Sequence, residues 1–224
     1  MKQSLSVSGI TKRFGNKTIL DNTYMRCDTG EIVGVFGRNG SGKSTLLKVI
    51  FGSEKANSIS ISINGSYCKP KEIIPQQKIA YLPQDPFLPK NKTVKDIIPI
   101  VLPKGSLQDK LFYRPEIHHL RDKKVGSLSM GQLRYLELLI VSHLPHPFLM
   151  LDEPFSMVEP LYKEKIQELL TELKQEKGII VTDHYYHDIL DISDKNLLVK
   201  DGKIIPIDKH EELITHGYLR AVNQ

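Results

Sequence analysis

The sequence Gly37-Arg38-Asn39-Gly40-Ser41-Gly42-Lys43-Ser44-Thr45 is the strongest indication of the fold of this chain. The apolar run at residues 33–36 comes directly before it, and residues 41–51 have the pattern of a helix that ends near Gly52. Glycine lets successive backbone N–H groups curl around an anion, and the N-terminus of a helix adds partial positive charge. A buried strand, a glycine-rich loop and a helix in this order predict a phosphate-binding loop in an α/β protein.

Two side chains of this phosphate loop, defined as residues 37–45, point to a nucleotide. Lys43 can reach the β- and γ-phosphates, and the hydroxyl of Ser44 can bind Mg²⁺. We therefore predict that the whole loop binds nucleotide, through Gly37, Arg38, Asn39, Gly40, Ser41, Gly42, Lys43, Ser44 and Thr45.

Two adjacent acids follow an apolar run farther along the chain. Residues 148–151 are entirely apolar and are predicted to form a strand, and Asp152 and Glu153 come directly after it. Because neighbouring strand residues point to opposite sides, the two carboxylates can do different jobs. We expect Asp152 to hold Mg²⁺ and Glu153 to orient the attacking water and accept its proton. The alternative is a strand that simply leaves the core for solvent, and the phosphate loop upstream favours the functional interpretation.

Strand and helix patterns alternate over most of the chain, which favours a largely parallel α/β sheet. Strands are predicted at residues 33–36, 59–63, 78–82, 148–151, 179–182, 197–200 and 203–207. Helices are predicted at residues 41–51, 133–141 and 161–173, with Gly178 near the end of the last one. Between Pro83 and about Gly126, prolines and two short helical patterns (93–98 and 107–113) replace the strands, which predicts a small helical insertion.

The composition is that of an ordinary globular protein, with 40% hydrophobic and 25% charged residues among 224. Cys27 and Cys68 lack the spacing of a metal site, which indicates a reduced, cytoplasmic setting. We expect no signal peptide, and the longest apolar patch, residues 97–102, is broken by Pro99 and too short to span a bilayer. The net charge is +5, but the lysines are scattered, so nucleic acid is not an expected partner.

An ordered series of motifs resembles the ABC ATPases, the nucleotide-binding subunits of ABC transporters. The segment Ser127–Arg134, SLSMGQLR, is similar to the LSGGQ signature of that family and is called the signature segment below. Phe14 stands where the family has an aromatic residue that stacks on adenine. Gln84 stands at the family's Q-loop, and His184 follows a predicted strand as the family's switch histidine does.

The resemblance implies an α/β fold with three parts in a single ABC ATPase domain, residues 1–224. These are a P-loop NTPase core with a parallel central sheet, an N-terminal antiparallel β subdomain and a small inserted α-helical subdomain. The core with the β subdomain is assigned to residues 1–84 and 135–224. The helical subdomain with the signature segment is assigned to residues 85–134.

The resemblance also implies roles for residues outside the phosphate loop. Two subunits would enclose two ATP molecules, and the signature segment of one would complete the site of the other. Its contacts to ATP are assigned to Ser129, Gly131 and Gln132. Catalysis is assigned to Glu153, His184, Lys43 and Gln84. Mg²⁺ binding is assigned to Ser44, Gln84 and Asp152.

The implied function is ATP binding and hydrolysis that powers transport through separate transmembrane permease subunits. The second ATPase subunit is either an identical copy or a related chain. Because the chain itself contains no predicted membrane span, the expected location is the cytoplasm, in peripheral association with the inner face of the cell membrane.

Three residues depart from the family pattern. Met130 replaces the first glycine of LSGGQ, and we expect its side chain to point sideways, although a lower turnover is compatible with it. Glu159 stands where the family's D-loop has aspartate, and Phe155 is bulkier than the small polar residue usual there. These two changes bear on communication between subunits.

Two other functions remain open from the sequence. One is a soluble ABC-type ATPase that acts on nucleic acid or ribosomes, although the single ABC unit and the absence of a long coiled coil count against it. The other is a nucleotide-dependent regulatory module with little catalysis, which Met130 favours and the retention of Lys43, Glu153 and His184 opposes. A GTPase is excluded because neither Asn-Lys pair continues into the guanine-binding N-K-x-D motif.

Overall fold

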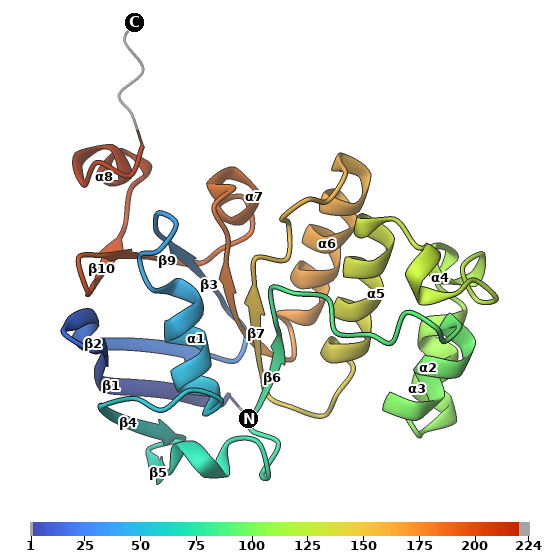
Figure 1. Ribbon diagram of the computed structural model, residues 1–224, viewed down its shortest axis with the longest axis horizontal. Helices are drawn as coiled ribbons and strands as arrows, with labels where there is room; N and C mark the ends of the chain where they lie inside the picture. The colour runs from blue at the N-terminus through green and yellow to red at the C-terminus, as the bar shows by residue number, and fades with distance from the viewer. Residues whose placement is uncertain (1, 220–224) are drawn as a thin grey trace, which may run out of the picture.

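A six-stranded sheet runs through the middle of the computed structural model, which describes residues 2–219 (Figure 1). The strand order is β10-β9-β3-β8-β7-β6. All neighbouring pairs are parallel except β9–β10, which is antiparallel. The strands are β3 (Ile32–Phe36), β6 (Ile79–Leu82), β7 (Phe148–Asp152), β8 (Gly178–Thr182), β9 (Lys195–Lys200) and β10 (Lys203–Ile207). This confirms the predicted parallel central sheet.

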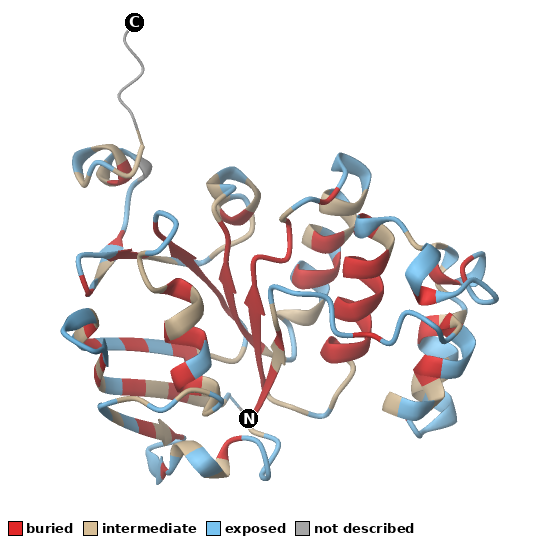
Figure 2. Cartoon of the chain, in the orientation of Figure 1, coloured by how far each residue is buried: buried red, intermediate tan, exposed pale blue. Residues whose placement is uncertain are grey.

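Continuous apolar runs place the inner strands between two layers. Every residue of β3, β7 and β8 is buried, as expected for parallel strands covered on both faces (Figure 2). Val33 and Val35 belong to the same apolar cluster as α1 (Lys43–Phe51), whereas Ile32 and Phe36 belong to the cluster of α5 (Met130–Ser142) and α6 (Pro160–Leu173). Figure 1 shows α1 on one side of the sheet and α5 and α6 on the other.

A second, antiparallel sheet packs on the α1 side, in the order β2-β1-β4-β5. Its strands are β1 (Ser4–Phe14), β2 (Lys17–Asp28), β4 (Ser58–Ile63) and β5 (Ser66–Cys68). Asn64 and Gly65 both have left-handed φ angles, 53° and 77°, and form the predicted hairpin turn between β4 and β5. The sheet confirms the expected N-terminal antiparallel β subdomain.

The insertion forms a helical arm beyond α5 (Figure 1). It contains α2 (Val94–Val101), α3 (Gly105–Phe112), α4 (Pro115–His118) and the 3₁₀ turn η2 (Val125–Ser127); another 3₁₀ turn, η1 (Pro70–Glu72), follows β5. The helical pattern predicted at residues 93–98 ends too early, because α2 continues through Pro99 to Val101. Proline removes a single backbone donor, and the helix retains a buried face around Ile97 and Ile98.

Other local predictions differ from the structure. Gly178 begins β8, and α6 ends before it, at Leu173. Glycine is needed at this position for close packing, because a side chain would collide with Phe148 and with the carbonyl oxygen of Asp28. The short helices α7 (Tyr186–Leu190) and α8 (His210–Thr215) were not predicted. The subdomain boundary at 134/135 stays a prediction, and α5 crosses it.

Residue 1 and residues 220–224 of the predicted domain lie outside the described part of the chain. Within residues 2–219, no helix is both long enough and apolar enough to cross a lipid bilayer.

Candidate functional site

The phosphate loop connects the C-terminal end of β3 to the N-terminus of α1, as its sequence predicts. Two of its glycines are required by close packing. A Cβ at Gly42, whose φ is 108°, would come within 2.8 Å of the Ile19 side chain. A Cβ at Gly37 would collide with the Ser41 hydroxyl and lie 2.8 Å from the carbonyl oxygen of Val199. The absence of side chains at these two positions lets the loop backbone pack closely against β2 and β9.

A cavity of about 460 Å³ opens in front of the phosphate loop. The structure brings four predicted residues from distant parts of the chain to this cavity, which we call the Lys43 cavity: Lys43, Gln84, Glu153 and His184. Its other lining residues are Ile19, Asn39, Gly40, Gly42, Ser44, Thr45 and Ser156.

Asp152 lies fully buried beneath this cavity and is held by three hydroxyl groups. The Ser44 hydroxyl donates to Oδ1 at 2.9 Å and the Thr182 hydroxyl donates to the same atom at 3.0 Å. The Tyr81 hydroxyl donates to Oδ2 at 2.9 Å. Burial, assisted by the Asp152 charge, raises the pKa of Tyr81, so this hydroxyl stays protonated and acts as a donor. The carboxylate is thereby fixed beside Ser44.

Glu153 lies at the end of the same strand and faces the cavity. Its Oε2 accepts a hydrogen bond of 2.9 Å from Nε2 of Gln84, and its Oε1 is 3.9 Å from the ammonium of Lys43. Its φ of 52° is left-handed, a conformation that costs a non-glycine residue on the order of 1–3 kcal/mol. The backbone N–H of Glu153 donates to the carbonyl oxygen of Thr182 at 2.9 Å, which helps to hold this turn.

Lys43 is almost fully buried, and its ammonium donates to the carbonyl oxygen of Gly37 at 2.8 Å. Burial lowers the pKa of Lys43, because the ammonium loses water, while the carboxylates of Glu153 and Asp152 act in the opposite direction. The ammonium is therefore held beside the phosphate loop with little water around it, where an anionic ligand would stabilise its charge.

His184 completes the cavity from the end of β8. Its Nδ1 is 3.6 Å from Oε2 of Glu153 and 3.4 Å from Oδ1 of Asp183. This nitrogen is buried and makes no hydrogen bond with the described residues. Asp183 is itself buried and accepts backbone N–H groups of His184, Tyr185 and Phe155, which fixes the segment after β8. Burial raises the pKa of Asp183.

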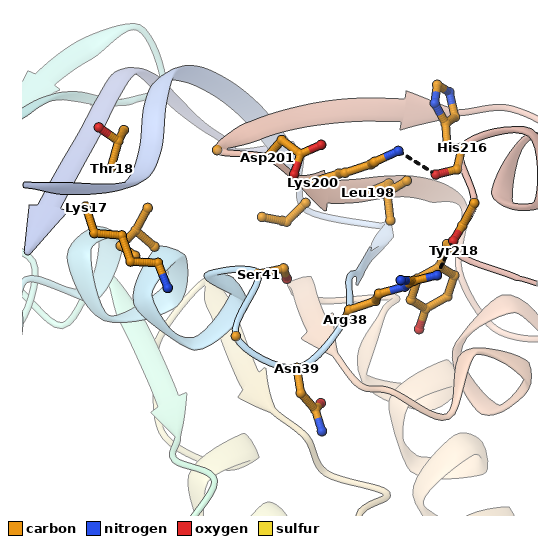
Figure 3. A pocket seen from close by; sticks show the side chains of 15 residues that line it. Lys17, Thr18, Arg38, Asn39, Ser41, Leu198, Lys200, Asp201, His216 and Tyr218 are labelled. Carbon is orange, nitrogen blue, oxygen red and sulfur yellow. Dashed lines mark hydrogen bonds between the residues drawn. The ribbon is translucent and has the colours of Figure 1, made fainter.

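Two phosphate-loop residues predicted to bind nucleotide, Arg38 and Ser41, line a second cavity of about 420 Å³ and not the Lys43 cavity (Figure 3). Asn39 and Gly40 line both cavities. Arg38 donates to the carbonyl oxygen of Gly217 at 2.6 Å, and Lys200 donates to that of His216 at 2.8 Å. Figure 3 shows Arg38 beside Tyr218, so its guanidinium binds the segment after α8. A direct contact of Arg38 with nucleotide stays a prediction.

Phe14 lies at the end of β1 with 51% of its surface exposed, and neither of these two cavities is lined by it. The ammonium of Lys12 lies 4.4 Å from its ring centroid, on one face of the ring. Lys12 is anchored there by Glu54 Oε1 at 2.6 Å and by the carbonyl oxygen of Lys55 at 2.7 Å. Stacking of adenine on Phe14 stays a prediction.

The signature segment forms the start of α5, away from the Lys43 cavity. Ser129 is the N-cap residue: its hydroxyl accepts the N–H of Gln132 at 3.2 Å, and the Gln132 side chain accepts the N–H of Ser129 at 3.0 Å. Met130 is helical, without a left-handed φ, and is 39% exposed, which answers the concern that a glycine is needed there. No residue of the signature segment lines the Lys43 cavity.

Gly131 gives the predicted D-loop residue a place to pack. A Cβ on Gly131 would collide with the carboxylate of Glu159 and would lie 3.0 Å from the ring of Tyr162. The signature segment and the D-loop of one chain are therefore in direct contact, and the missing side chain of Gly131 makes that contact possible. Phe155, noted for its bulk, is fully buried in the core.

Sequence reasoning assigned no role to four residues of the site: Tyr81, Thr182, Ser156 and Ile19. Tyr81 has no motif of its own, and its role depends on β6 pairing beside β7. Ser156 is three residues after Glu153, and this short separation in the sequence could have indicated that it lies at the same cavity. Ile19 reaches the phosphate loop only because β2 passes beside it.

The comparisons with known proteins agree with one another. A family model described as ABC transporter matches residues 20–156. The chain is 27% identical to the lipopolysaccharide export system ATP-binding protein LptB of Acidithiobacillus ferridurans, over 99% of this chain and 97% of that protein. It is 29% identical to an uncharacterized ABC transporter ATP-binding protein of Methanocaldococcus jannaschii, over 95% and 80% of the two chains. A nucleotide-free ATP-binding cassette from an ABC transporter has a similar solved structure, with a TM-score of 0.78, 26% identity and coverage of 96% and 94%.

Proposed function

The chain belongs to the ABC transporter family, and on that basis we propose how its residues bind and hydrolyse ATP to power transport through separate membrane subunits. The observation that carries this proposal is the convergence of predicted residues at one cavity. Ser44 lies 2.9 Å from the buried Asp152, while Lys43, Gln84, Glu153 and His184 line the space in front of it.

The phosphate loop binds the triphosphate. Backbone N–H groups of residues 37–45 and the N-terminus of α1 face the phosphates, and the buried ammonium of Lys43 reaches the β- and γ-phosphates. Phe14 stacks on adenine with the face of its ring opposite to Lys12. The cation on the other face keeps the ring in place and leaves one face open for the base.

The residues around Asp152 fit Mg²⁺. The donors are a hydroxyl from Ser44, a carboxylate from Asp152 and the amide oxygen of Gln84, all of the oxygen type that Mg²⁺ prefers. When bound, Mg²⁺ neutralises negative charge on the β- and γ-phosphates. Asp152 is already oriented by the Tyr81 and Thr182 hydroxyls, so little rearrangement is needed to present its carboxylate.

Glu153 acts as the general base. Its carboxylate, held by Gln84 and close to Lys43, orients a water molecule at the γ-phosphate and accepts its proton. His184 lies beside this carboxylate, with Nδ1 at 3.6 Å from Oε2, and its imidazole contacts the γ-phosphate. The left-handed turn at Glu153 aims the side chain into the cavity while Asp152 stays buried beneath it.

A second subunit completes each site. Since the signature segment does not line the cavity of its own chain, we infer that Ser129, Gly131 and Gln132 cap ATP held by the other subunit. The N-terminus of α5 adds partial positive charge at the point where the transferred phosphoryl group becomes more negative. The membrane partners are separate permease subunits, and the dimer works at the inner face of the cell membrane.

The proposal predicts how turnover depends on protein concentration. Because each ATP needs residues from two subunits, ATP turnover per subunit rises with concentration in dilute solution and then reaches a plateau. This is measured by phosphate release over a dilution series, alongside the mass of the protein by light scattering. A constant turnover per subunit, in samples that scatter as monomers, would contradict the shared site.

Isolation of the complex from solubilised membranes tests the partners. We expect integral membrane chains to co-purify with this protein and to stimulate its ATP turnover. Salt-sensitive recovery of DNA or RNA, with no membrane chain, would instead favour the soluble ABC-type ATPase.

Tyr81→Phe tests the hydroxyl support of Asp152. Loss of one of three donors to this buried carboxylate should raise the Mg²⁺ concentration for half-maximal ATP turnover about 10- to 100-fold, on the scale of a hydrogen bond to a charged group. Tyr67→Phe is the matched control, because Tyr67 lies exposed on β5. An unchanged Mg²⁺ dependence in Tyr81→Phe would mean that Tyr81 does not orient Asp152.

A further inference from the structure

Two charged side chains of α5 are buried although the proposed ATP chemistry assigns them no role. Glu137 is 0% exposed and Arg134 is 3% exposed. Burial raises the pKa of Glu137 and lowers that of Arg134, because both groups lose water. Burying such charges costs desolvation free energy, which good hydrogen-bonding partners offset. The partners of these two side chains therefore indicate what they do.

Glu137 holds the segment that follows Gln84. Its Oε1 accepts the backbone N–H of Phe87 at 2.8 Å and that of Leu88 at 3.3 Å. Its Oε2 lies 3.4 Å from Nη1 of Arg134. Gln84 itself is fixed to Glu153, so Glu137 and Glu153 hold the two ends of one short segment.

Arg134 holds the end of the carboxylate strand. Its Nη2 donates to the carbonyl oxygen of Asp152 at 2.7 Å and lies 3.5 Å from that of Glu153. These carbonyl groups flank the residue with the left-handed backbone. A guanidinium can serve both a carboxylate and a carbonyl group, because its donors point in several directions.

The same helix begins with the signature segment. Ser129 is the N-cap residue of α5, and Arg134 and Glu137 follow it after about one and about two turns. One rigid helix therefore contacts the other subunit's ATP at its start, according to the proposed function, and its own chain's Gln84 segment and Glu153 turn farther along.

We propose that Arg134 and Glu137 are positioning residues that link the N-terminus of α5 in a chain to the Gln84 and Glu153 side chains of the same chain. Capping of one ATP by α5 thereby sets the geometry of the other ATP site in the dimer. This inference rests on the proposed shared site, and it adds a path inside each chain by which the two sites communicate.

If Arg134 and Glu137 had a purely structural role, the experiment would give a different result. It would lower stability and activity whatever the state of the signature segment, so its effect on kcat would multiply with that of a signature mutation. A link in series has nothing left to transmit once the contact of the signature segment is lost. Its effect on kcat would then be much smaller in the signature variant.

The experiment is a double-mutant cycle on kcat with Ser129→Ala and Glu137→Gln in the full transporter complex. If each single change lowers kcat about 30-fold, we expect the double variant to lose about 30- to 100-fold, and not the product of about 900-fold. The Kd for ATP of the isolated chain should change less than about 2-fold in Glu137→Gln, because the phosphate loop is untouched. Multiplied effects on kcat overturn the inference.

The control is Glu116→Gln, which removes another ion pair between the insertion and the core. Glu116 Oε1 lies 2.6 Å from the ammonium of Lys165, and neither residue lines the Lys43 cavity. Its kcat should stay within about 2-fold of the wild type in both backgrounds.

Arg134→Lys is a second variant for the same cycle, since it keeps the charge but not the two-sided hydrogen bonding. If neither Glu137→Gln nor Arg134→Lys folds, as judged by thermal unfolding, the pair is structural and the inference is wrong. A wild-type complex without ATP turnover would instead overturn the proposed function itself, and the inference with it.

Discussion

Lys43→Ala abolishes ATP binding: we expect the Kd for ATP to rise at least about 100-fold, equivalent to about 2.7 kcal/mol. Lys43 supplies the buried cation of the phosphate loop, and its ammonium is held 2.8 Å from the carbonyl oxygen of Gly37 and 3.9 Å from Glu153. Removing it leaves the γ-phosphate facing the carboxylate of Glu153 without a compensating positive charge. Such a contact contributes far more in a buried cavity than at the surface.

The Kd is measured by isothermal titration calorimetry of the purified chain with ATP. Lys48→Ala is the matched control, because Lys48 lies exposed on the same helix, and its Kd should stay within about 2-fold of the wild type. Both variants should retain cooperative thermal unfolding. Near-normal ATP affinity in a folded Lys43→Ala variant would show that nucleotide binds elsewhere.

Glu153→Gln is expected to retain ATP and lose hydrolysis, with kcat lower by about 10²- to 10⁴-fold, the range of a lost general base. The amide keeps the size of the side chain and can still accept from Gln84, but it cannot take a proton from water. Removal of the negative charge near Lys43 also favours the ATP-bound state. Saturating ATP should therefore lock the variant in a stable dimer.

Turnover and mass are measured on the same samples, by phosphate release and by light scattering after size-exclusion chromatography. Glu168→Gln, an exposed position on α6, controls for the loss of one negative charge and should behave like the wild type. A Glu153→Gln variant that stays monomeric at saturating ATP would count against the shared site. Equal and negligible rates in the wild type and in Glu153→Gln would favour a regulatory module.

The departure from the family pattern in the D-loop is explained by a contact with the signature segment. Glu159 replaces the aspartate of the D-loop, and its carboxylate packs directly on Gly131 of the signature segment. The extra methylene lengthens the side chain toward a position that only glycine leaves open. Two of the three departures from the family pattern therefore meet at the start of α5: Glu159 contacts Gly131, and Met130 is the residue next to it.

Much of the fold follows from local patterns. The phosphate loop, the apolar strands β3, β7 and β8, and the hairpin at Asn64-Gly65 are each determined by a few adjacent residues. Their chemistry is local as well, because glycines, a helix N-terminus and a strand period of two act over short stretches. Predictions from local sequence failed where a residue is constrained by distant ones. Gly178, for example, is constrained by its contacts with Phe148 and Asp28.

Local residue patterns were enough to show that an apolar strand leads into a phosphate-binding loop and a helix, and that another leads into two acids. The side chains that surround those acids are set by how the strands and helices pack together. Tyr81 and Thr182 reach Asp152 because β6 and β8 lie on either side of β7, and Arg134 reaches its carbonyl oxygen because α5 packs against the same sheet. Strand order and helix packing arise from burial summed over the whole chain, so no short stretch of residues carries that information.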